Sequence, residues 1–256
     1  IFCVFEALKR GVSVDKIHEI TLIDEWFLNK LLILVDMENK LKEGNIDEAT
    51  YFKAKKLGFL DRTIEAFTGE ECKYSATPVY KMVDTCAAEF DAETPYFYST
   101  FDEENEAEEF IKEKGSNKET VMVFGSGPIR IGQGIEFDYS SVHCVWSLKK
   151  AGYDVVIVNN NPETVSTDFD TADRLYFEPL TNEDVMGIIK TEKPIGAVVA
   201  FGGQTAIKLT KYLSDHGIRI LGTSADAIDM AEDRERFDEL LEEHHISRPK
   251  GFTVMN

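Results

Sequence analysis

The stretch from residue 121 to residue 139, VMVFGSGPIRIGQGIEFDY, constrains the fold more than any other part of the chain. Its first four residues are apolar and partly β-branched, which is typical of a strand that is buried on both faces. The glycines and the proline that follow, in residues 125–128, end this strand sharply. A glycine-rich loop can present backbone N–H groups to an anion, and it can equally be a tight turn beneath a helix. The sequence therefore predicts a buried strand with a special loop at its carboxyl end.

A dinucleotide-binding site is the first hypothesis to test for this loop. Its fingerprint is G-x-G-x-x-G opening directly into a helix, with an acidic residue after the second strand. Gly125 and Gly127 fit, but Arg130 holds the third glycine position, and we expect the helix to begin only at about residues 138–140. The second predicted strand, 154–158, is followed by three asparagines instead of a carboxylate. These features disfavour an NAD-dependent dehydrogenase, which stays as a third hypothesis.

Composition excludes several other classes of protein. The chain of 256 residues is long enough for one large domain or two of ordinary size. Its formal net charge of -19 argues against nucleic-acid binding, because such proteins display basic stripes. No apolar run approaches the ~20 residues of a membrane span. The four cysteines lack C-x-x-C spacing, so we interpret them as reduced thiols. We therefore expect a cytoplasmic protein that binds no membrane. Because the chain begins with Ile1, we interpret it as a piece of a longer polypeptide.

The first 70 residues or so are predicted to be helical. The expected helices are 2–10, 14–20 after a cap at Ser13, one between caps at Asp24 and Gly44, one after a cap at Asp47, and one from a cap at Asp61 to Gly69. The aromatic residues of this region are explained more simply as core and interface residues than as a cofactor site; they are Trp26, Phe27, Tyr51, Phe52 and Phe59. If this module docks another subunit instead, some of these side chains are exposed.

The next segment changes character. Residues 75–101 are expected to be extended chain lying over a surface, and the acidic run 102–109, DEENEAEE, a solvated linker or the start of an exposed helix. We place the boundary of the helical domain at about residue 115, which gives domains at 1–115, 116–234 and 235–256.

From residue 120 onward, strands and helices alternate. The predicted strands are 121–124, 154–158, 175–177, 195–201 and 218–221, with helices at 139–151, 182–191 and 205–215. This order predicts an α/β fold with a doubly wound, mostly parallel, Rossmann-like sheet.

Three loops of this sheet leave the carboxyl ends of strands, where ligands bind in open α/β sheets. Glycines and amides from all three are expected to converge on one crevice. The candidate crevice residues are Gly125, Gly127, Gln133, Asn161, Gly202, Gly203 and Gln204. Each loop alone is also explained by a turn from a strand into a helix.

Four segments then show a resemblance to a known family. GSGPIRIGQGIEFDYSSVH, VNNNPETVSTDFDTADRLYFEPLT, FGGQTAIKL and LGTSADAIDMAEDRERF closely resemble the large chain of the carbamoyl phosphate synthetase family. PVYKMVDTCAAEFDAETPYFYST resembles the stretch that leads out of its oligomerisation domain. The resemblance covers essentially the whole chain, but it is weaker in the first helices. The GEECKYS segment is shorter than the corresponding segment of the family pattern.

The resemblance implies a domain organisation. The family's large chain holds two synthetase halves, each a pre-ATP-grasp domain followed by an ATP-grasp domain, with a helical oligomerisation domain between them. The chain is then expected to be that helical domain, the pre-ATP-grasp domain of the second half and the start of an ATP-grasp domain.

The resemblance also implies an activity. The intact enzyme would be an ATP-dependent carbon–nitrogen ligase that makes carbamoyl phosphate from bicarbonate, glutamine-derived ammonia and two ATP, with Mg or Mn, and the second half phosphorylates carbamate. The expected partners are the rest of the large chain, a small glutaminase subunit and further copies. The piece alone is not expected to turn over or to hold a cofactor tightly. The alternative is an assembly module with no ligand of its own.

Three residues carry roles by resemblance. Arg234 matches a position that contacts ATP, and a guanidinium can hold a phosphate with its fork of donors. Its plainer interpretation is an exposed helix in which it pairs with Asp238, four residues on. Glu136 and Glu163 match carboxylates that line the passage for carbamate; taken alone, each is an ordinary loop carboxylate. No catalytic residue and no metal ligand is expected within the chain.

Overall fold

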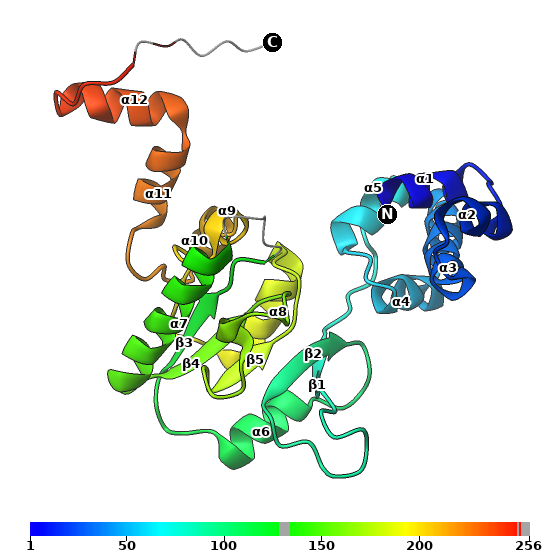
Figure 1. Cartoon of the computed structure of the whole chain (residues 1–256), viewed down its shortest axis with the longest axis horizontal. Coiled ribbons are helices and arrows are strands. Elements are labelled where there is room, and N and C mark those ends of the chain that lie inside the picture. Colours follow the sequence, from blue (N-terminus) through cyan, green and yellow to red (C-terminus); the bar gives the residue numbers. More distant parts are fainter. Residues whose placement is uncertain (128–133, 250, 252–256) are drawn as a thin grey trace. The chain divides into compact units, whose positions relative to one another are not determined.

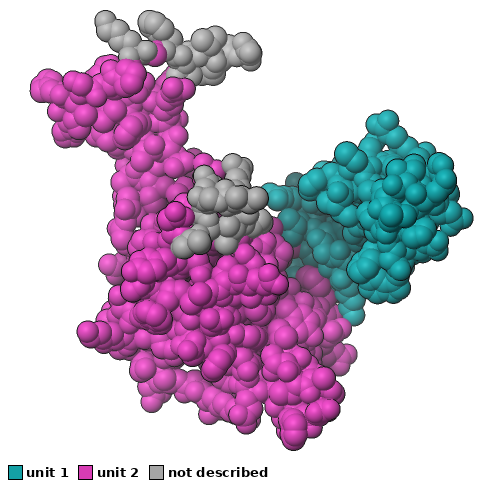
Figure 2. Space-filling model, in the orientation of Figure 1, with its two compact units in different colours: residues 1–78 teal, residues 79–256 magenta. Residues whose placement is uncertain are grey.

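The computed structural model describes residues 1–127, 134–249 and 251, and it divides the chain into two compact units, residues 1–78 and 79–256 (Figures 1 and 2). The domain boundary near residue 115 stays a prediction. In the structure, residues 79–114 pack with the second unit, because Tyr80, Phe97 and Ala107 are buried in its core.

The first unit is helical. Its helices are α1 (Phe2–Lys9), α2 (Val14–Thr21), α3 (Glu25–Lys42), α4 (Glu48–Lys56) and α5 (Asp61–Thr68). The side chains of Ser13, Asp24 and Asp47 accept backbone N–H groups of the following first turns, as predicted. The predicted cap at Asp61 is wrong, because Leu60 is the N-cap and Asp61 lies in the first turn, where a carboxylate favours the helix dipole.

Two apolar clusters hold these helices together. The first consists of Leu8, Ile17, Leu28 and Val35, and the second of Met37, Leu41, Tyr51, Ala54 and Ile64. Helix α3 contributes to both clusters. Among the aromatic residues, Tyr51 is fully buried, whereas Trp26 and Phe27 are each 59% exposed.

The second unit contains a mostly parallel sheet, as predicted. Its strands are β1 (Val79–Met82), β2 (Tyr96–Thr100), β3 (Thr120–Phe124), β4 (Asp154–Val158), β5 (Arg174–Tyr176) and β6 (Gly196–Val198), in the order β1-β2-β5-β4-β3-β6. Strand β1 is antiparallel to β2, and the other neighbouring strands are parallel. The segment expected as a strand at 218–221 pairs with β6 only through a bridge between Ala197 and Ile220.

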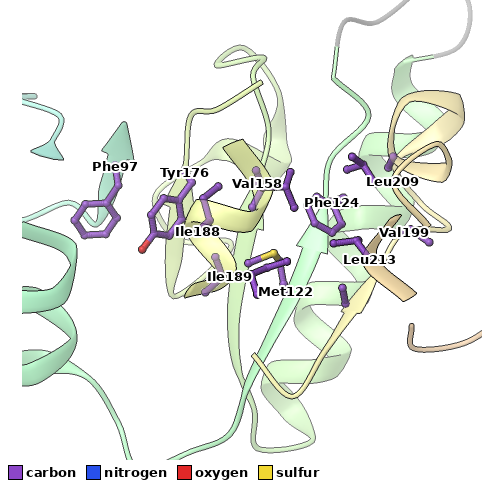
Figure 3. Packing of buried hydrophobic residues seen from close by; sticks show 14 of the residues in the cluster. Phe97, Met122, Phe124, Val158, Tyr176, Ile188, Ile189, Val199, Leu209 and Leu213 are labelled. Carbon is purple, nitrogen blue, oxygen red and sulfur yellow. The ribbon is translucent and has the colours of Figure 1, made fainter. Parts of the chain in front are cut away.

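Helices cover both faces of the sheet. The remaining helical elements are α6 (Glu106–Lys114), α7 (Gly134–Lys150), η1 (Val165–Thr167), α8 (Asn182–Glu192), α9 (Gly203–Ile207), α10 (Thr210–Asp215), α11 (Ala225–Glu232) and α12 (Arg234–Glu243). On one face, Val123 of β3 packs in a cluster with Val145 of α7. On the other, Met122 of β3 packs in a cluster with Ile188 of α8 and Leu213 of α10 (Figure 3). The alternation along β3 explains its continuous apolar sequence.

The strand order reverses at β3. From β3 the chain runs through α7 to β4 on one side, and from β5 it returns through α8 to β6 on the other side. Helix α7 begins at Gly134, so the predicted start at residues 138–140 is wrong. Ile135, Glu136 and Phe137 are ordinary helix residues, and a carboxylate in the first turn is favourable. The carboxyl ends of β3 and β6 thus form a topological switch point, where open sheets bind ligands.

Among the described helices, none combines the length and the apolar character that crossing a lipid bilayer requires.

A buried ionic network joins β5 to α8. The guanidinium of Arg174 donates to the carboxylate of Glu192, with Nε–Oε1 and Nη2–Oε2 distances of 2.9 Å, and the Tyr176 hydroxyl donates to Oε1 at 2.7 Å. Arg174 also lies 3.5 Å from a carboxylate oxygen of Asp154. All four residues are buried, so the charges are compensated within the protein.

Glu178 is a second buried carboxyl, located just after β5. It is 4% exposed and accepts the backbone N–H of Ser99 in β2. Burial raises the pKa of Glu178 to about 7, against the opposing effect of this hydrogen bond, and the nearby Asp184 adds to the increase.

This pKa predicts how the stability depends on pH. Between about pH 4.5 and 7 the folded protein keeps the Glu178 proton that the unfolded chain has released. The free energy of unfolding should therefore fall as the pH rises through this window, by about 3 kcal/mol, and be flat above it with respect to this group. Urea denaturation at several pH values measures the effect. Glu178→Gln should remove this component, and an unchanged pH profile in that variant would contradict the prediction.

Candidate functional site

The glycine loop begins directly at the end of β3. Gly125 extends the sheet ladder, since its N–H donates to the carbonyl of Val158 at 2.9 Å. A Cβ at position 125 would lie 2.5 Å from Cγ and Nδ2 of Asn159, so only glycine fits against that side chain. Gly127 has φ of +66°, a conformation that glycine adopts without strain. The loop is therefore shaped around Asn159, the first residue after β4.

Asn159 joins the glycine loop to the loop that follows β4. Its side chain is fully buried, and Oδ1 accepts the N–H groups of Gly127 and Asn161, both at 3.2 Å. The Asn161 side chain in turn accepts the N–H of Glu163 at 3.1 Å. Gly127 and Asn161, two of the predicted crevice residues, are thus held by one side chain.

The third loop follows β6 and approaches the first closely. A Cβ on Gly202 would lie 2.7 Å from the carbonyl oxygen of Gly125 and 2.8 Å from that of Phe124. Gly203 has φ of +60°, and a Cβ there would lie 3.3 Å from the ring of Phe137 in α7. Gly202 therefore contacts the glycine loop and Gly203 the first turn of α7. Gln204 is exposed beside them.

Asp138 fastens the loop after β4 to α7. Its carboxylate accepts the N–H of Val165 at 2.9 Å and that of Ser166 at 3.2 Å. We call the contact of Asp138 with Val165 and Ser166 the Asp138 junction. Glu136 and Glu163 are both exposed; Glu136 lies two positions before Asp138, and Glu163 lies two positions before Val165. The two carboxylates therefore belong to segments that are bonded to one another.

The remaining candidate residues lie apart or outside the described part. Arg234 is exposed at the first residue of α12, which packs against α11. The alternative pairing with Asp238 is not formed among the described residues; Asp238 instead lies 3.1 Å from Arg248. Gln133 lies outside the described residues. Within residues 1–127, 134–249 and 251, no group of three His, Cys, Asp or Glu residues is arranged to hold a metal ion.

Known families match both units. The model of the carbamoyl phosphate synthase pre-ATP-grasp domain matches residues 117–230, and that of the oligomerisation domain of the carbamoyl-phosphate synthetase large chain matches residues 1–82. The chain belongs to the carbamoyl phosphate synthase large-chain family. Curated large chains of this name from Lachnoclostridium phytofermentans and Agathobacter rectalis are 55% and 56% identical over 99% of the chain, and one from Thermoanaerobacter sp. X514 is 54% identical over 98%. The chain spans 24% of the length of these relatives.

Two residues that organise the loops in this family member were not predicted as site residues. In the sequence analysis, Asn159 appears only as one of the asparagines that replace the carboxylate of a dinucleotide site. Asp138 appears only as an expected start of the following helix. The available signal for Asn159 was its position, a short amide directly after a strand whose last four residues are apolar and 32 residues beyond Gly127. Neither hydrogen bond of Asp138 follows from spacing, because its partners are 27 and 28 residues away.

The Asp138 junction is testable by substitution. Asp138→Ala should lower the free energy of unfolding by about 1–2 kcal/mol, because two backbone N–H groups lose a charged acceptor. Asp138→Asn keeps one acceptor oxygen and should lose less. Chemical denaturation measures both, and equal losses in the two variants would show that the hydrogen bonds do not carry the effect.

Proposed function

We propose that the full-length protein containing this chain makes carbamoyl phosphate from bicarbonate, glutamine-derived ammonia and two ATP, and that the sheet unit belongs to the half that phosphorylates carbamate. The observation that carries this proposal is the convergence of three strand-end loops in a chain of the carbamoyl phosphate synthase family. Because the chain spans 24% of its relatives, the activity is assigned to the whole protein.

Within this function, Glu136 and Glu163 are proposed to line the passage for carbamate. Both are exposed, and both lie on segments that Asp138 bonds together, so their separation is set by the fold. Arg234 is proposed to contact a phosphate of ATP. Its exposed guanidinium, for which the described residues offer no ion pair, suits a phosphate. ATP supplies the phosphoryl group, and Mg or Mn would be held by the remainder of the large chain. The small glutaminase subunit is the proposed source of ammonia.

The test uses the full-length protein with its glutaminase subunit. Bicarbonate, glutamine and MgATP should yield carbamoyl phosphate, whereas the 256-residue chain alone should not turn over. Arg234→Ala should raise KM for ATP, and Glu136→Lys or Glu163→Lys should raise the ATP consumed per product. Glu239→Lys, at an exposed position of α12, is the surface control. A folded full-length protein that makes no carbamoyl phosphate would refute the proposal.

An NAD-dependent dehydrogenase is disfavoured by the structure of β4. The residue after this strand is Asn159, whose amide oxygen is occupied by two loop N–H groups, so no carboxylate stands there for a ribose hydroxyl. Titration calorimetry with millimolar NAD should therefore detect no binding.

A second candidate function, self-association, rests on an exposed apolar surface in the first unit. We define the α2–α3 corner as Ile20, Leu22, Trp26 and Phe27, which are 69%, 80%, 59% and 59% exposed. Leu22 adopts φ of 58°, a left-handed conformation in which a leucine is strained. Four such side chains offer on the order of 500 Å² of apolar surface, which is comparable to the largest apolar patch of a typical monomer, and such a patch is often functional.

Sedimentation at two protein concentrations tests this candidate. The chain should associate more at the higher concentration, and Trp26→Ala with Phe27→Ala should remove the dependence. Phe90→Ala, which truncates an apolar side chain that is 76% exposed in the second unit, is the matched control. A monomer at both concentrations would exclude self-association through this corner.

A further inference from the structure

Asn159 occupies a special place at the switch point. It is the first residue after β4, its side chain is fully buried, and its Oδ1 atom accepts two backbone N–H groups from different loops. One is the N–H of Gly127, 32 positions earlier, and the other is that of Asn161. Among the described residues, Nδ2 of the same side chain has no hydrogen-bond partner. Oδ1 is therefore the atom that joins the two loops.

The surroundings of Asn159 restrict it to one position. Gly125 touches it so closely that a methyl group there would overlap Cγ and Nδ2 at 2.5 Å. The carbonyl oxygen of Gly125 in turn packs against Gly202 of the third loop. A shift of the Asn159 side chain would thus disturb the glycine loop directly and the loop after β6 through it.

The two loops that Asn159 joins lead to the two exposed carboxylates. Gly125 of the first loop packs against Gly202, and the neighbouring Gly203 packs against Phe137, which follows Glu136 in the first turn of α7. In the second loop, the chain reaches Glu163 two residues after Asn161. The Asn161 side chain accepts the Glu163 N–H, so the bonding is continuous from Asn159 to this carboxylate residue.

We propose that Asn159 is a positioning residue, which holds the glycine loop and the loop after β4 in one arrangement and thereby sets the spacing of Glu136 and Glu163. The spacing part of this inference rests on the proposed function, in which these carboxylates line the carbamate passage. The loop-holding part depends only on the geometry of the chain. Asn159 itself need not touch the substrate.

Hydrogen exchange of the 256-residue chain tests the loop-holding part. In Asn159→Ala, the amides of Gly127 and Asn161 should exchange at least about tenfold faster, because both lose their acceptor. Asn159→Asp keeps an acceptor oxygen and should restore the protection. Unchanged exchange in Asn159→Ala, or equal loss in Asn159→Asp, would overturn the proposal.

A double-mutant cycle provides an independent variant. Gly125→Ala should accelerate the same two amides, because the added methyl group displaces the Asn159 side chain. Asn159→Gly also removes the Cβ of residue 159, which would lie 2.8 Å from the new methyl group. In the double variant Gly125→Ala, Asn159→Gly the methyl group therefore enters vacated space, so its effect should not add to that of Asn159→Gly alone. Additive effects would mean that Gly125 acts elsewhere. If Asn159→Ala does not fold, Gly125→Ala and Asn159→Asp still decide the question.

The spacing part is tested in the full-length protein. Asn159→Ala should raise the ATP consumed per carbamoyl phosphate while bicarbonate-dependent ATP hydrolysis continues, and Asn159→Asp should restore the ratio. A purely structural role would lower both rates together and leave the ratio unchanged, which would overturn this part. If the wild-type protein makes no carbamoyl phosphate, the proposed function fails, whereas the exchange result still decides whether Asn159 holds the loops.

Discussion

Replacing Glu192 with alanine should lower the free energy of unfolding by about 3–5 kcal/mol. The substitution leaves the buried guanidinium of Arg174 with one nearby carboxylate, that of Asp154 at 3.5 Å. It also removes the acceptor of the Tyr176 hydroxyl, which is fully buried. An uncompensated charge in the interior costs far more than the loss of an exposed ion pair. Urea denaturation monitored by circular dichroism measures the change.

Two controls separate charge compensation from loss of side-chain volume. Arg174→Met combined with Glu192→Leu removes both charges and leaves Asp154 with Lys118 at 3.8 Å, so it should be less destabilising than Glu192→Ala alone. Glu108→Ala breaks a pair with Lys112 whose members are 51% and 74% exposed, and it should change stability by less than about 0.5 kcal/mol. If the double variant is as unstable as Glu192→Ala, the unpaired charge is not the cause.

Gly202→Ala is expected to destabilise the protein by about 3 kcal/mol or more. The added Cβ would lie 2.3 Å from Cβ of Ala206 and less than 3 Å from the carbonyl oxygens of Phe124 and Gly125. Two of these neighbours are backbone atoms at the end of a central strand, so they cannot move without distorting the sheet. The loss should appear as a lower midpoint in thermal and urea denaturation.

Gly251→Ala is the control for this substitution. Among the described residues, no atom lies within 4 Å of the Cβ position at Gly251, so the same added methyl group should leave stability unchanged. If Gly202→Ala were as stable as Gly251→Ala, the close packing between the loops after β3 and β6 would be refuted.

The central strands could be predicted from the sequence because their signal is local. Strand β4 has the predicted bounds, since a run of valines and an isoleucine lies between the turn at Gly152 and three asparagines. The helix caps at Ser13 and Asp47 were likewise predicted, because a capping side chain bonds to backbone within three residues of itself. The convergence of three loops followed from the parallel order of the strands.

Other features depend on partners that are distant in sequence. Strands β1 and β2 were expected only as extended chain, because their place in the sheet is decided by packing of Tyr80 and Phe97 against Tyr176. The acceptor role of Asn159 depends on Gly127, and an amide has no sequence pattern that reveals which loop it will bond to. The start of α7 was misplaced because glycines were interpreted as loop residues up to Phe137.

The participation of α3 in both apolar clusters of the first unit has a thermodynamic consequence. One end of this helix supplies Leu28 to one cluster, and the other end supplies Leu41 to the second. Heat that releases either cluster also frees the helix that supports the other, so residues 1–78 should melt in a single cooperative transition.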